Sequence, residues 1–442
     1  MKTFKLGGIH PVENKISAQQ PIEVAPIPST VYIPVSQHLG APAKPIVEKG
    51  DLVKTGQLIA KGDGFISANV HSSVSGKVLK VDEVVDFSGY RRLSIVIETE
   101  GDEWMESIDK STTIIKDCKL ESKAIVDKIN EMGIVGMGGA TFPSHVKLSV
   151  PQGKKAEYLL INGVECEPYL TSDHRLMMEK GREIMVGITI LMKGLQVTRA
   201  MIGIENNKTD AIQLMTTLAT EFQGITVYPL KVKYPQGAEK QLIKALVNRE
   251  VPSGKLPIEV GCVVHNVGTA FAVYEAIQKN KPLFERIVTV TGKSLKKPSN
   301  LLARVGTSIN DLITMAGGLP EDSGKIISGG PMMGRALSNA DAPITKGTSG
   351  ILIMPVKESK RYIPINCVRC GRCVTVCAMG LEPFLLAKLS ENLSWEEAES
   401  EHIMDCMECG SCQYTCPSGR PLLDFVRVGK NAVAQIIRTR KN

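Results

Sequence analysis

The sequence lacks any apolar run long enough to cross a bilayer, which takes about 20 residues. Its longest candidate, residues 184–192, is flanked by Arg182 and Lys193 and favours a buried helix. The opening MKTFKLGGIHPVENK has no apolar signal core, so we expect a cytosolic protein, or one attached to a membrane from the cytosolic side. Aromatic residues make up only 5% of the chain. That scarcity disfavours an extended stacking platform for nucleic acid.

The cysteines are not distributed as a disulfide framework. Eleven are present, and eight of them lie between Cys367 and Cys416, while Cys118, Cys166 and Cys262 are scattered. Tight clustering in a chain expected to be cytosolic indicates metal binding. The net charge of +7 suits acidic redox partners or an anionic lipid surface, and equally a mildly basic soluble protein.

The clustered cysteines form the pattern C-x2-C-x2-C-x3-C twice, with a proline after the second copy. Three thiolates at this spacing can occupy three corners of one cubane, while the fourth reaches the other cluster. We therefore expect two [4Fe–4S] clusters that exchange their fourth ligands. One would be held by Cys367, Cys370, Cys373 and Cys416, and the other by Cys406, Cys409, Cys412 and Cys377. Gly371 and Gly410 would let each loop turn close to sulfur.

The alternative is a pair of zinc sites, but structural zinc usually joins two C-x2-C hooks across a longer loop. With all eight thiolates committed, neither cluster keeps an open iron for substrate chemistry. Two adjacent clusters are suited to relaying single electrons. The segment between the cysteine runs contains a capping box, Ser394 with Glu397, which predicts a helix there. An α-helical ferredoxin arrangement is therefore expected.

At 442 residues the chain exceeds a single core, and its patterns predict four domains. Residues 1–110 alternate short apolar runs with turns, and resemble the barrel-sandwich hybrid of biotinyl and lipoyl carriers. No hairpin there presents a lysine for modification, Lys77 being the nearest, so a structural role is expected. Residues 111–282 alternate strands with helices, as in a parallel α/β sheet. Residues 283–356 predict a small α+β unit, and residues 357–442 carry the clusters.

A glycine-rich loop and three polar stretches lie in the α/β segment. They read GMGGATFPSHVK from Gly136, NGVECEP from Asn162, YPQGAE from Tyr234 and HNVGT from His265. Alone, the loop is a weak phosphate-binding signal. Together, in this order, the four stretches resemble the flavin- and NADH-binding subunit of respiratory complex I and related hydrogenases. The implied fold is a Rossmann-like α/β flavin domain.

This resemblance implies a role for each matching residue. Those that would bind FMN are Gly136, Gly138, Gly139 and Lys147 at the phosphate, with Asn162, Asn266 and Thr269 at the flavin; Tyr234 and Gly237 complete the cofactor-binding set. Phe142, Glu165, Glu167 and Glu239 would line the nicotinamide site for NADH. Taken singly each has a plainer interpretation, such as a turn cap for Glu167 or a satisfied core histidine for His265. The family has arginine where this chain has Met137.

The whole chain, in order, resembles the RnfC family, which forms part of the Rnf electron-transport complex. GGIHPVENK, PVSQHLGAP, GDLVKTGQLIA and VHSSVSGKV carry the likeness, followed by the flavin-type core and the paired cysteine runs. Residues 283–356 resemble the SLBB β-grasp module of the same families. The likeness implies NADH oxidation through FMN, electron relay through two [4Fe–4S] clusters, and partners among the membrane subunits, the ferredoxin-like subunit and ferredoxin. It also implies a peripheral position on the cytoplasmic face of the cell membrane.

Two other functions remain open from sequence. One is a non-catalytic relay or scaffold subunit with a vestigial flavin site, and the other is a cobalamin- or quinone-handling protein using the β-grasp module. The last stretch, PLLDFVRVGKNAVAQIIRTRKN, has helical periodicity with several basic residues. It could dock on lipid or on a membrane subunit, although a surface helix with a solvated basic face is favoured.

Overall fold

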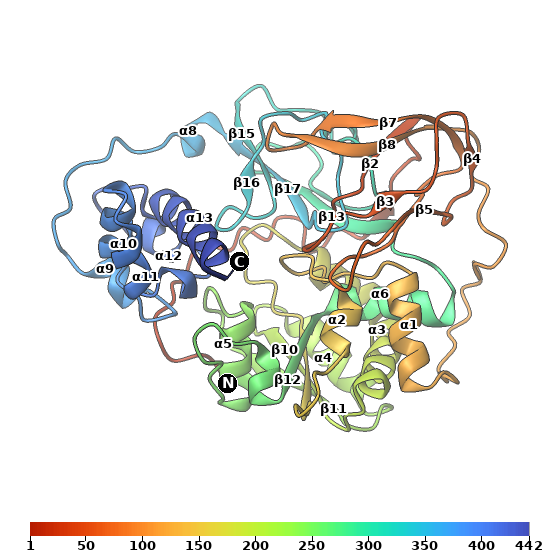
Figure 1. Cartoon of the computed structure of the whole chain (residues 1–442), viewed down its shortest axis with the longest axis horizontal. Helices are drawn as coiled ribbons and strands as arrows, with labels where there is room; N and C mark the ends of the chain where they lie inside the picture. Colours follow the sequence, from red (N-terminus) through yellow and green to blue (C-terminus); the bar gives the residue numbers. More distant parts are fainter. Residues whose placement is uncertain (442) are drawn as a thin grey trace.

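The structure, a computed structural model, describes residues 1–441. The chain forms four sheets with helices around them (Figure 1). The strands are β1 (Ile22–Val24), β2 (Thr30–Pro34), β3 (Lys44–Pro45), β4 (Leu52–Val53), β5 (Leu58–Lys61), β6 (Val70–His71), β7 (Gly76–Val85), β8 (Arg91–Thr99), β9 (Tyr158–Asn162), β10 (Ala200–Glu205), β11 (Ile225–Leu230), β12 (Cys262–Asn266), β13 (Glu285–Thr291), β14 (Ser299–Arg304), β15 (Ser323–Ser328), β16 (Arg335–Ala336) and β17 (Gly350–Pro355). The helices are α1 (Ser122–Glu131), α2 (Ser144–Leu148), α3 (Ser172–Leu195), α4 (Thr209–Ala219), α5 (Glu239–Val247), α6 (Val267–Gln278), α7 (Ile309–Met315), α8 (Val356–Ser359), α9 (Arg372–Thr375), α10 (Pro383–Glu391), α11 (Trp395–Ser400), α12 (Ser411–Tyr414) and α13 (Leu422–Lys441), with 3₁₀ turns η1 (Pro257–Val260) and η2 (Ile403–Asp405).

The barrel-sandwich unit consists of two small antiparallel sheets, ordered β2-β8-β7-β4 and β3-β5-β6. Alternate residues of β2 point inward, so that Val31 and Ile33 are fully buried. They share one core with Ile59 and with Ile95 and Ile97 of β8. The predicted β-rich first unit is confirmed.

The α/β core is a four-stranded parallel sheet in the order β11-β10-β9-β12. One of its two inner strands, β9, carries the fully buried run Leu159 to Ile161, the unbroken apolar pattern of a strand covered on both faces. Helices α3 and α6 pack against each other beside it. The apolar run at residues 184–192 lies within α3, as predicted, and is mostly buried.

The β-grasp unit is a six-stranded mixed sheet, ordered β1-β14-β13-β17-β15-β16, with α7 alongside. Its edge strand β1 comes from the beginning of the chain and runs parallel to β14, with Ile22 opposite Asn300. The sheet is therefore completed by a segment distant in sequence.

The C-terminal unit is a set of short helices around a small apolar core, shown in blue in Figure 1. Between the cysteine runs lie α10 and α11, which confirms the helical arrangement predicted there. Ser394 is the N-cap residue of α11, but its side chain makes no capping hydrogen bond. Helix α13 packs against α10. Its basic residues Arg427 and Lys430 both pair with Glu408, at 3.1 Å each.

The first seventeen residues, here called the N-terminal arm, lie outside the barrel-sandwich unit. The arm crosses the α/β core, where Ile9 and Tyr234 exchange two backbone hydrogen bonds of 2.9 Å. It also touches the C-terminal unit, because Gly8 N–H donates to the Val376 carbonyl at 2.9 Å. The arm thus joins two units that are far apart in the sequence.

Candidate functional site

The carboxyl ends of β9 and β12 bring two predicted flavin residues together. Asn162 and Asn266 end these strands and are directly paired in the parallel register. In open α/β sheets, ligands bind outside this edge. Asn266 caps α6 by accepting a hydrogen bond from Gly268 N–H at 2.8 Å, and it donates to Asp173 at 2.6 Å.

The glycine-rich loop lies over the beginning of α6. Met137 N–H donates to the Thr269 hydroxyl at 3.0 Å, which ties the loop to a predicted flavin contact. A Cβ atom at Gly138 would lie 2.9 Å from the Asn266 side chain, whereas one at Gly139 would meet nothing within 4 Å. The loop therefore needs glycine at Gly138 for close approach and leaves open space beside Gly139.

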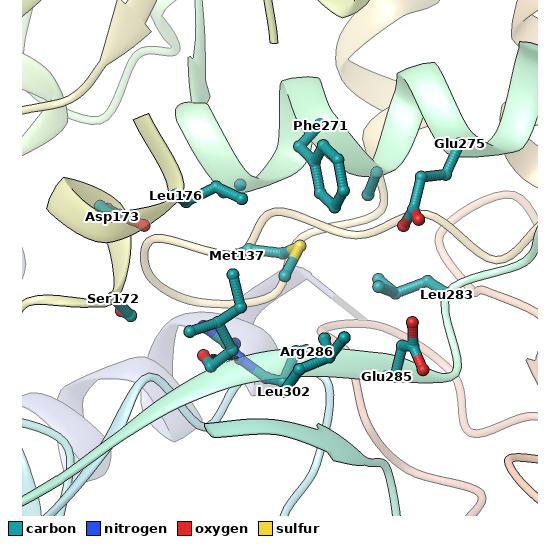
Figure 2. Close-up of a pocket in the computed structure, with 13 residues that line it drawn as sticks. Met137, Ser172, Asp173, Leu176, Phe271, Glu275, Leu283, Glu285, Arg286 and Leu302 are labelled. Atoms are coloured by element: carbon teal, nitrogen blue, oxygen red, sulfur yellow. Dashed lines mark hydrogen bonds between the residues drawn. The ribbon is translucent and has the colours of Figure 1, made fainter. Parts of the chain in front are cut away.

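The cavity beneath this loop separates the α/β core from the β-grasp sheet. Figure 2 shows Met137 at its centre, between Phe271 on α6 and Arg286 on β13. Met137 is almost fully buried and belongs to the main apolar core. The residue that departs from the family pattern is therefore used for packing. Arg286 is buried and donates to the Lys346 carbonyl, and burial lowers its pKa to about 10.

Lys147, the predicted phosphate ligand, is paired with another predicted site residue. It is presented by α2, and its ammonium contacts the Glu239 carboxylate at 2.8 Å and the Val264 carbonyl at 3.0 Å. Glu239 is the first residue of α5. Asn162 is tied to the same segment by a 2.7 Å hydrogen bond to the Gly237 carbonyl. The residues predicted for flavin and for nicotinamide thus share one region.

His265, on β12 beside Lys147, has no partner for either ring nitrogen among residues 1–441. Burial, followed by the charge of Lys147, lowers its pKa to about 3, so the ring is neutral. A buried polar group without a partner is uncommon. The interpretation of His265 as a satisfied core histidine is therefore wrong. Its free nitrogens fit the polar part of a bound cofactor.

The other three residues predicted at the nicotinamide site are distributed differently. Glu165 precedes α3, and its carboxylate accepts hydrogen bonds from the first turn of that helix, from Asp173 N–H at 2.7 Å and His174 N–H at 3.2 Å. Glu167 is turned toward the β-grasp unit, where it accepts from Met332 N–H and Met333 N–H at 3.1 and 2.7 Å. Burial raises the pKa of Glu167 to about 7. Phe142 lies in the glycine-rich loop, and its carbonyl accepts from Gly136 N–H at 2.9 Å.

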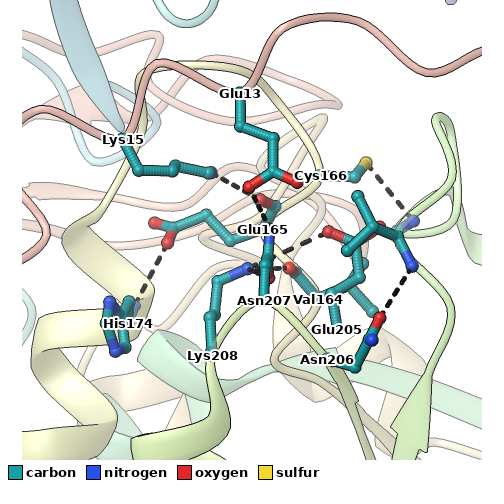
Figure 3. A network of polar contacts seen from close by, with 12 residues as sticks. Glu13, Lys15, Val164, Glu165, Cys166, His174, Glu205, Asn206, Asn207 and Lys208 are labelled. Atoms are coloured by element: carbon teal, nitrogen blue, oxygen red, sulfur yellow. Dashed lines mark hydrogen bonds and ion pairs between the residues drawn. The ribbon is translucent and has the colours of Figure 1, made fainter.

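Two charged residues near the site were missed by the sequence reasoning. Asp173 contacts Asn266, and burial together with Glu165 raises the pKa of Asp173 to about 7. The sequence signal that could have identified it is an acidic residue in the first turn of a helix. Lys15 of the N-terminal arm donates to three carbonyls, those of Glu165, Glu167 and Leu170, at 2.6–2.9 Å. Figure 3 shows this lysine beside Glu165. It lies in the GGIHPVENK stretch, which was used only as a family signature.

The two cysteine runs fold as equivalent halves. Gly371 and Gly410 are the N-cap residues of α9 and α12. They adopt positive φ of 72° and 77°, a conformation that glycine adopts without strain. The end of the second run returns to the start of the first: the Ser418 hydroxyl donates to the Asn366 carbonyl at 3.1 Å. Cys416 is thereby held near Cys367.

The last cysteine of the first run lies with the second run. Burial, with smaller contributions from Cys409 and Cys377, raises the pKa of Cys406 to about 11. Burial likewise raises the pKa of Cys412 strongly, with added effects from Cys406, Cys409 and Cys377. Thiols gathered in this way favour metal binding, since metal replaces the proton on sulfur. The side chains therefore fit the exchanged fourth ligand expected from the spacing.

Within residues 1–441, no three His, Cys, Asp or Glu side chains come together closely enough to hold a single metal ion. Across the same residues, no helix is sufficiently long and apolar to span a bilayer.

Family profiles match four successive stretches of the chain. They are the RnfC barrel sandwich hybrid domain at residues 2–102, the Nuo51 FMN-binding domain at 129–275, the SLBB domain at 287–336 and the 4Fe-4S dicluster domain at 366–420. The profiles cover all four units seen in the fold.

Two curated proteins resemble the chain over nearly its full length. Component C of the proton-translocating ferredoxin:NAD(+) oxidoreductase complex from Clostridium ljungdahlii is 48% identical, covering 98% of this chain and 94% of that protein. Its counterpart in the Na(+)-translocating complex of Acetobacterium woodii is 45% identical, covering 98% and 97%. An NAD+-reducing [NiFe]-hydrogenase in the air-oxidized state shares the fold, with a TM-score of 0.51 and 15% identity over 71% of this chain and 66% of that one.

Proposed function

The chain belongs to the RnfC family of ion-translocating ferredoxin:NAD(+) oxidoreductase (Rnf) complexes, and from that premise we propose that it exchanges electrons between NAD(H) and a two-cluster relay within such a complex. One observation carries the proposal. The flavin-type edge of β9 and β12 and the crossed cysteine runs lie in one chain, joined through the segment that begins at Tyr234.

The cofactors are FMN and two [4Fe–4S] clusters. When bound, the flavin accepts a hydride and releases electrons singly, and the clusters carry them one at a time. We assign Cys377, Cys406, Cys409 and Cys412, the inner cysteine set, to one cluster. We assign Cys367, Cys370, Cys373 and Cys416, the outer cysteine set, to the other.

The protein supplies position and charge at the flavin site. Asn162, Asn266 and Thr269 offer amide and hydroxyl groups beside the glycine-rich loop, and Lys147 offers a point charge for phosphate. His265 adds a neutral imidazole with both nitrogens free for hydrogen bonding. Phe142, Glu165, Glu167 and Glu239 are the groups proposed for the nicotinamide side.

The partners follow from family membership. The relatives are named as parts of ferredoxin:NAD(+) oxidoreductase complexes, so the proposed partners are NAD(H), ferredoxin, the ferredoxin-like subunit and the membrane subunits. Peripheral attachment at the cytoplasmic face of the cell membrane is part of the same proposal. The pairing of Arg427 and Lys430 within the C-terminal unit leaves less of the α13 basic surface for lipid.

A non-catalytic relay subunit is the second candidate, favoured by the existing ion pair between Lys147 and Glu239. Anaerobic protein loaded with FMN and titrated with NADH distinguishes the two. Bleaching of flavin absorbance followed by reduced-cluster EPR signals supports NADH entry. Clusters that dithionite reduces but NADH leaves oxidised, at saturating FMN, would reject NADH entry and favour the relay.

A further inference from the structure

The inner cysteine set faces the α/β core. Gly8 of the N-terminal arm bonds to the carbonyl of Val376 at 2.9 Å, and Gln241 of α5 donates to the carbonyl of Ala378 at 3.0 Å. These two contacts hold the residues on either side of Cys377. In the outer set, by contrast, Cys367 and Cys370 are exposed.

Tyr234 connects this cysteine set to the flavin site directly. Its hydroxyl donates to the carbonyl of Cys409 at 2.8 Å, and its side chain is buried. Three residues further along, the carbonyl of Gly237 accepts from Asn162 at 2.7 Å. Since the chain advances by at most about 3.8 Å per residue, the backbone positions 234 and 237 are separated by no more than about 11 Å.

The tyrosine is fixed from three sides. Its backbone exchanges two hydrogen bonds with Ile9 of the N-terminal arm. Its hydroxyl lies 3.4 Å from Glu167, whose carboxylate is held by the backbone of Met332 and Met333 in the β-grasp unit. A side chain constrained in this way has little freedom left to lose, which is what precise positioning requires.

We propose that Tyr234 is a positioning residue for electron transfer: its hydrogen bond to Cys409 holds the inner cluster next to the flavin site, and the outer cluster exchanges electrons with the partner protein. This inference rests on the proposed function. The hydroxyl donates to the carbonyl of Cys409 and not to its sulfur. The positive end of the O–H dipole at this ligand residue favours the reduced, more negative state of the cluster, because fixed dipoles and hydrogen bonds around a cluster help to set its potential.

The test uses the full chain with both clusters and FMN. Tyr234→Phe removes the hydroxyl and keeps the ring, and Tyr274→Phe is the matched control, a tyrosine of α6 that contacts the Ile115 backbone. EPR-monitored redox titration with dithionite gives the potential of each cluster without involving NADH. Rapid mixing with NADH then follows flavin bleaching and cluster reduction as separate phases.

In Tyr234→Phe we expect the reduction potential of one cluster to fall. The equilibrium constant for its reduction should be about fivefold smaller, as for the loss of one hydrogen bond. Cysteine variants of each set identify which cluster has shifted. The cluster phase after NADH should slow relative to flavin bleaching, while Tyr274→Phe behaves as wild type. Loss of the inner cluster with the outer one retained would support the same assignment.

Unchanged potentials together with an unchanged cluster phase would overturn the inference, as would a shift confined to the outer cluster. Failure of the proposed function looks different. In that case NADH does not bleach the flavin of the wild-type protein, yet the dithionite titration still reports whether Tyr234 acts on the inner cluster.

Discussion

The crossed ligation of the two clusters predicts an outcome that sequence proximity alone would reverse. Cys416 lies in the second cysteine run, but the hydrogen bonds of Ser418 and Ile365, at 3.1 and 3.0 Å, place its end of the chain beside Cys367. We therefore expect Cys416→Ala to destroy the outer cluster and to spare the cluster bound mainly by its own run. Cys377→Ala should do the reverse.

The magnitude follows from the ligand count. Each set has four thiolates, and removing one leaves three for a cluster that needs four. Bound iron should therefore fall from about eight to about four atoms per chain in each variant. Neither of these two hydrogen bonds involves the Cys416 sulfur, so the local fold should persist.

The assay is iron and acid-labile sulfide analysis of anaerobically purified protein, with EPR of the reduced state. Cys118→Ala, at a thiol outside both sets, is the control and should retain full iron content. Loss of the Cys406 cluster in Cys416→Ala, or a normal two-cluster spectrum in that variant, would refute the exchanged ligands.

Four further predictions concern the flavin site, the arm and the buried charges. Lys147→Ala should weaken FMN binding by about tenfold or more, as for loss of a charge-assisted contact, with iron content unchanged; wild-type flavin occupancy would reject the phosphate assignment. His265→Leu removes an unpaired polar group, so it should stabilise the flavin-free protein by about 1 kcal/mol or more in urea melts. The same variant should bind FMN more weakly. A variant that is less stable than the wild type without flavin would show that the His265 ring nitrogens have partners. Gly7→Ala should destabilise the docking of the C-terminal unit by about 1–3 kcal/mol, because φ of Gly7 is +62° and a Cβ there would lie 2.5 Å from the Cys377 carbonyl. Limited proteolysis should then release that unit more readily. An unaltered digestion pattern would count against the arm contact. Burial raises the pKa of Glu205 to about 7, so the carboxyl holds its proton more tightly in the native protein than in the unfolded chain. Its contribution to stability is complete below about pH 4.5 and is lost as the pH rises through 7. In Glu205→Gln, the urea midpoint should therefore vary less with pH over this range, and a slope identical to that of the wild type would refute the shift.

Much of the fold was predictable because its signals are local. Buried runs such as residues 159–161 predict parallel strands, and the cysteine spacing predicts both the clusters and their exchanged ligands. The helix between the cysteine runs was also predicted, although the expected capping bond of Ser394 is absent from the structure. These features depend on neighbours within a few residues, which a sequence displays directly.

What escaped prediction depends on contacts between distant segments. Nothing in the sequence indicates that β1 completes the β-grasp sheet, or that Lys15 reaches the carbonyls of Glu165 and Glu167. Tyr234 was recognised only as part of a flavin motif, because its bond to Cys409 joins residues 175 positions apart. The unpaired state of His265 is equally invisible, since it follows from what surrounds the ring in the folded chain.

The N-terminal arm also imposes an order on biosynthesis. The arm is made first, but Val376, which accepts its Gly8 hydrogen bond, emerges from the ribosome more than 360 residues later. Domains fold largely in the order of synthesis, so the arm stays unpaired on that side until the first cysteine run is complete. Closure between the units is therefore a late event in synthesis, and it leaves the cysteine loops accessible to the cell's cluster-assembly machinery until then.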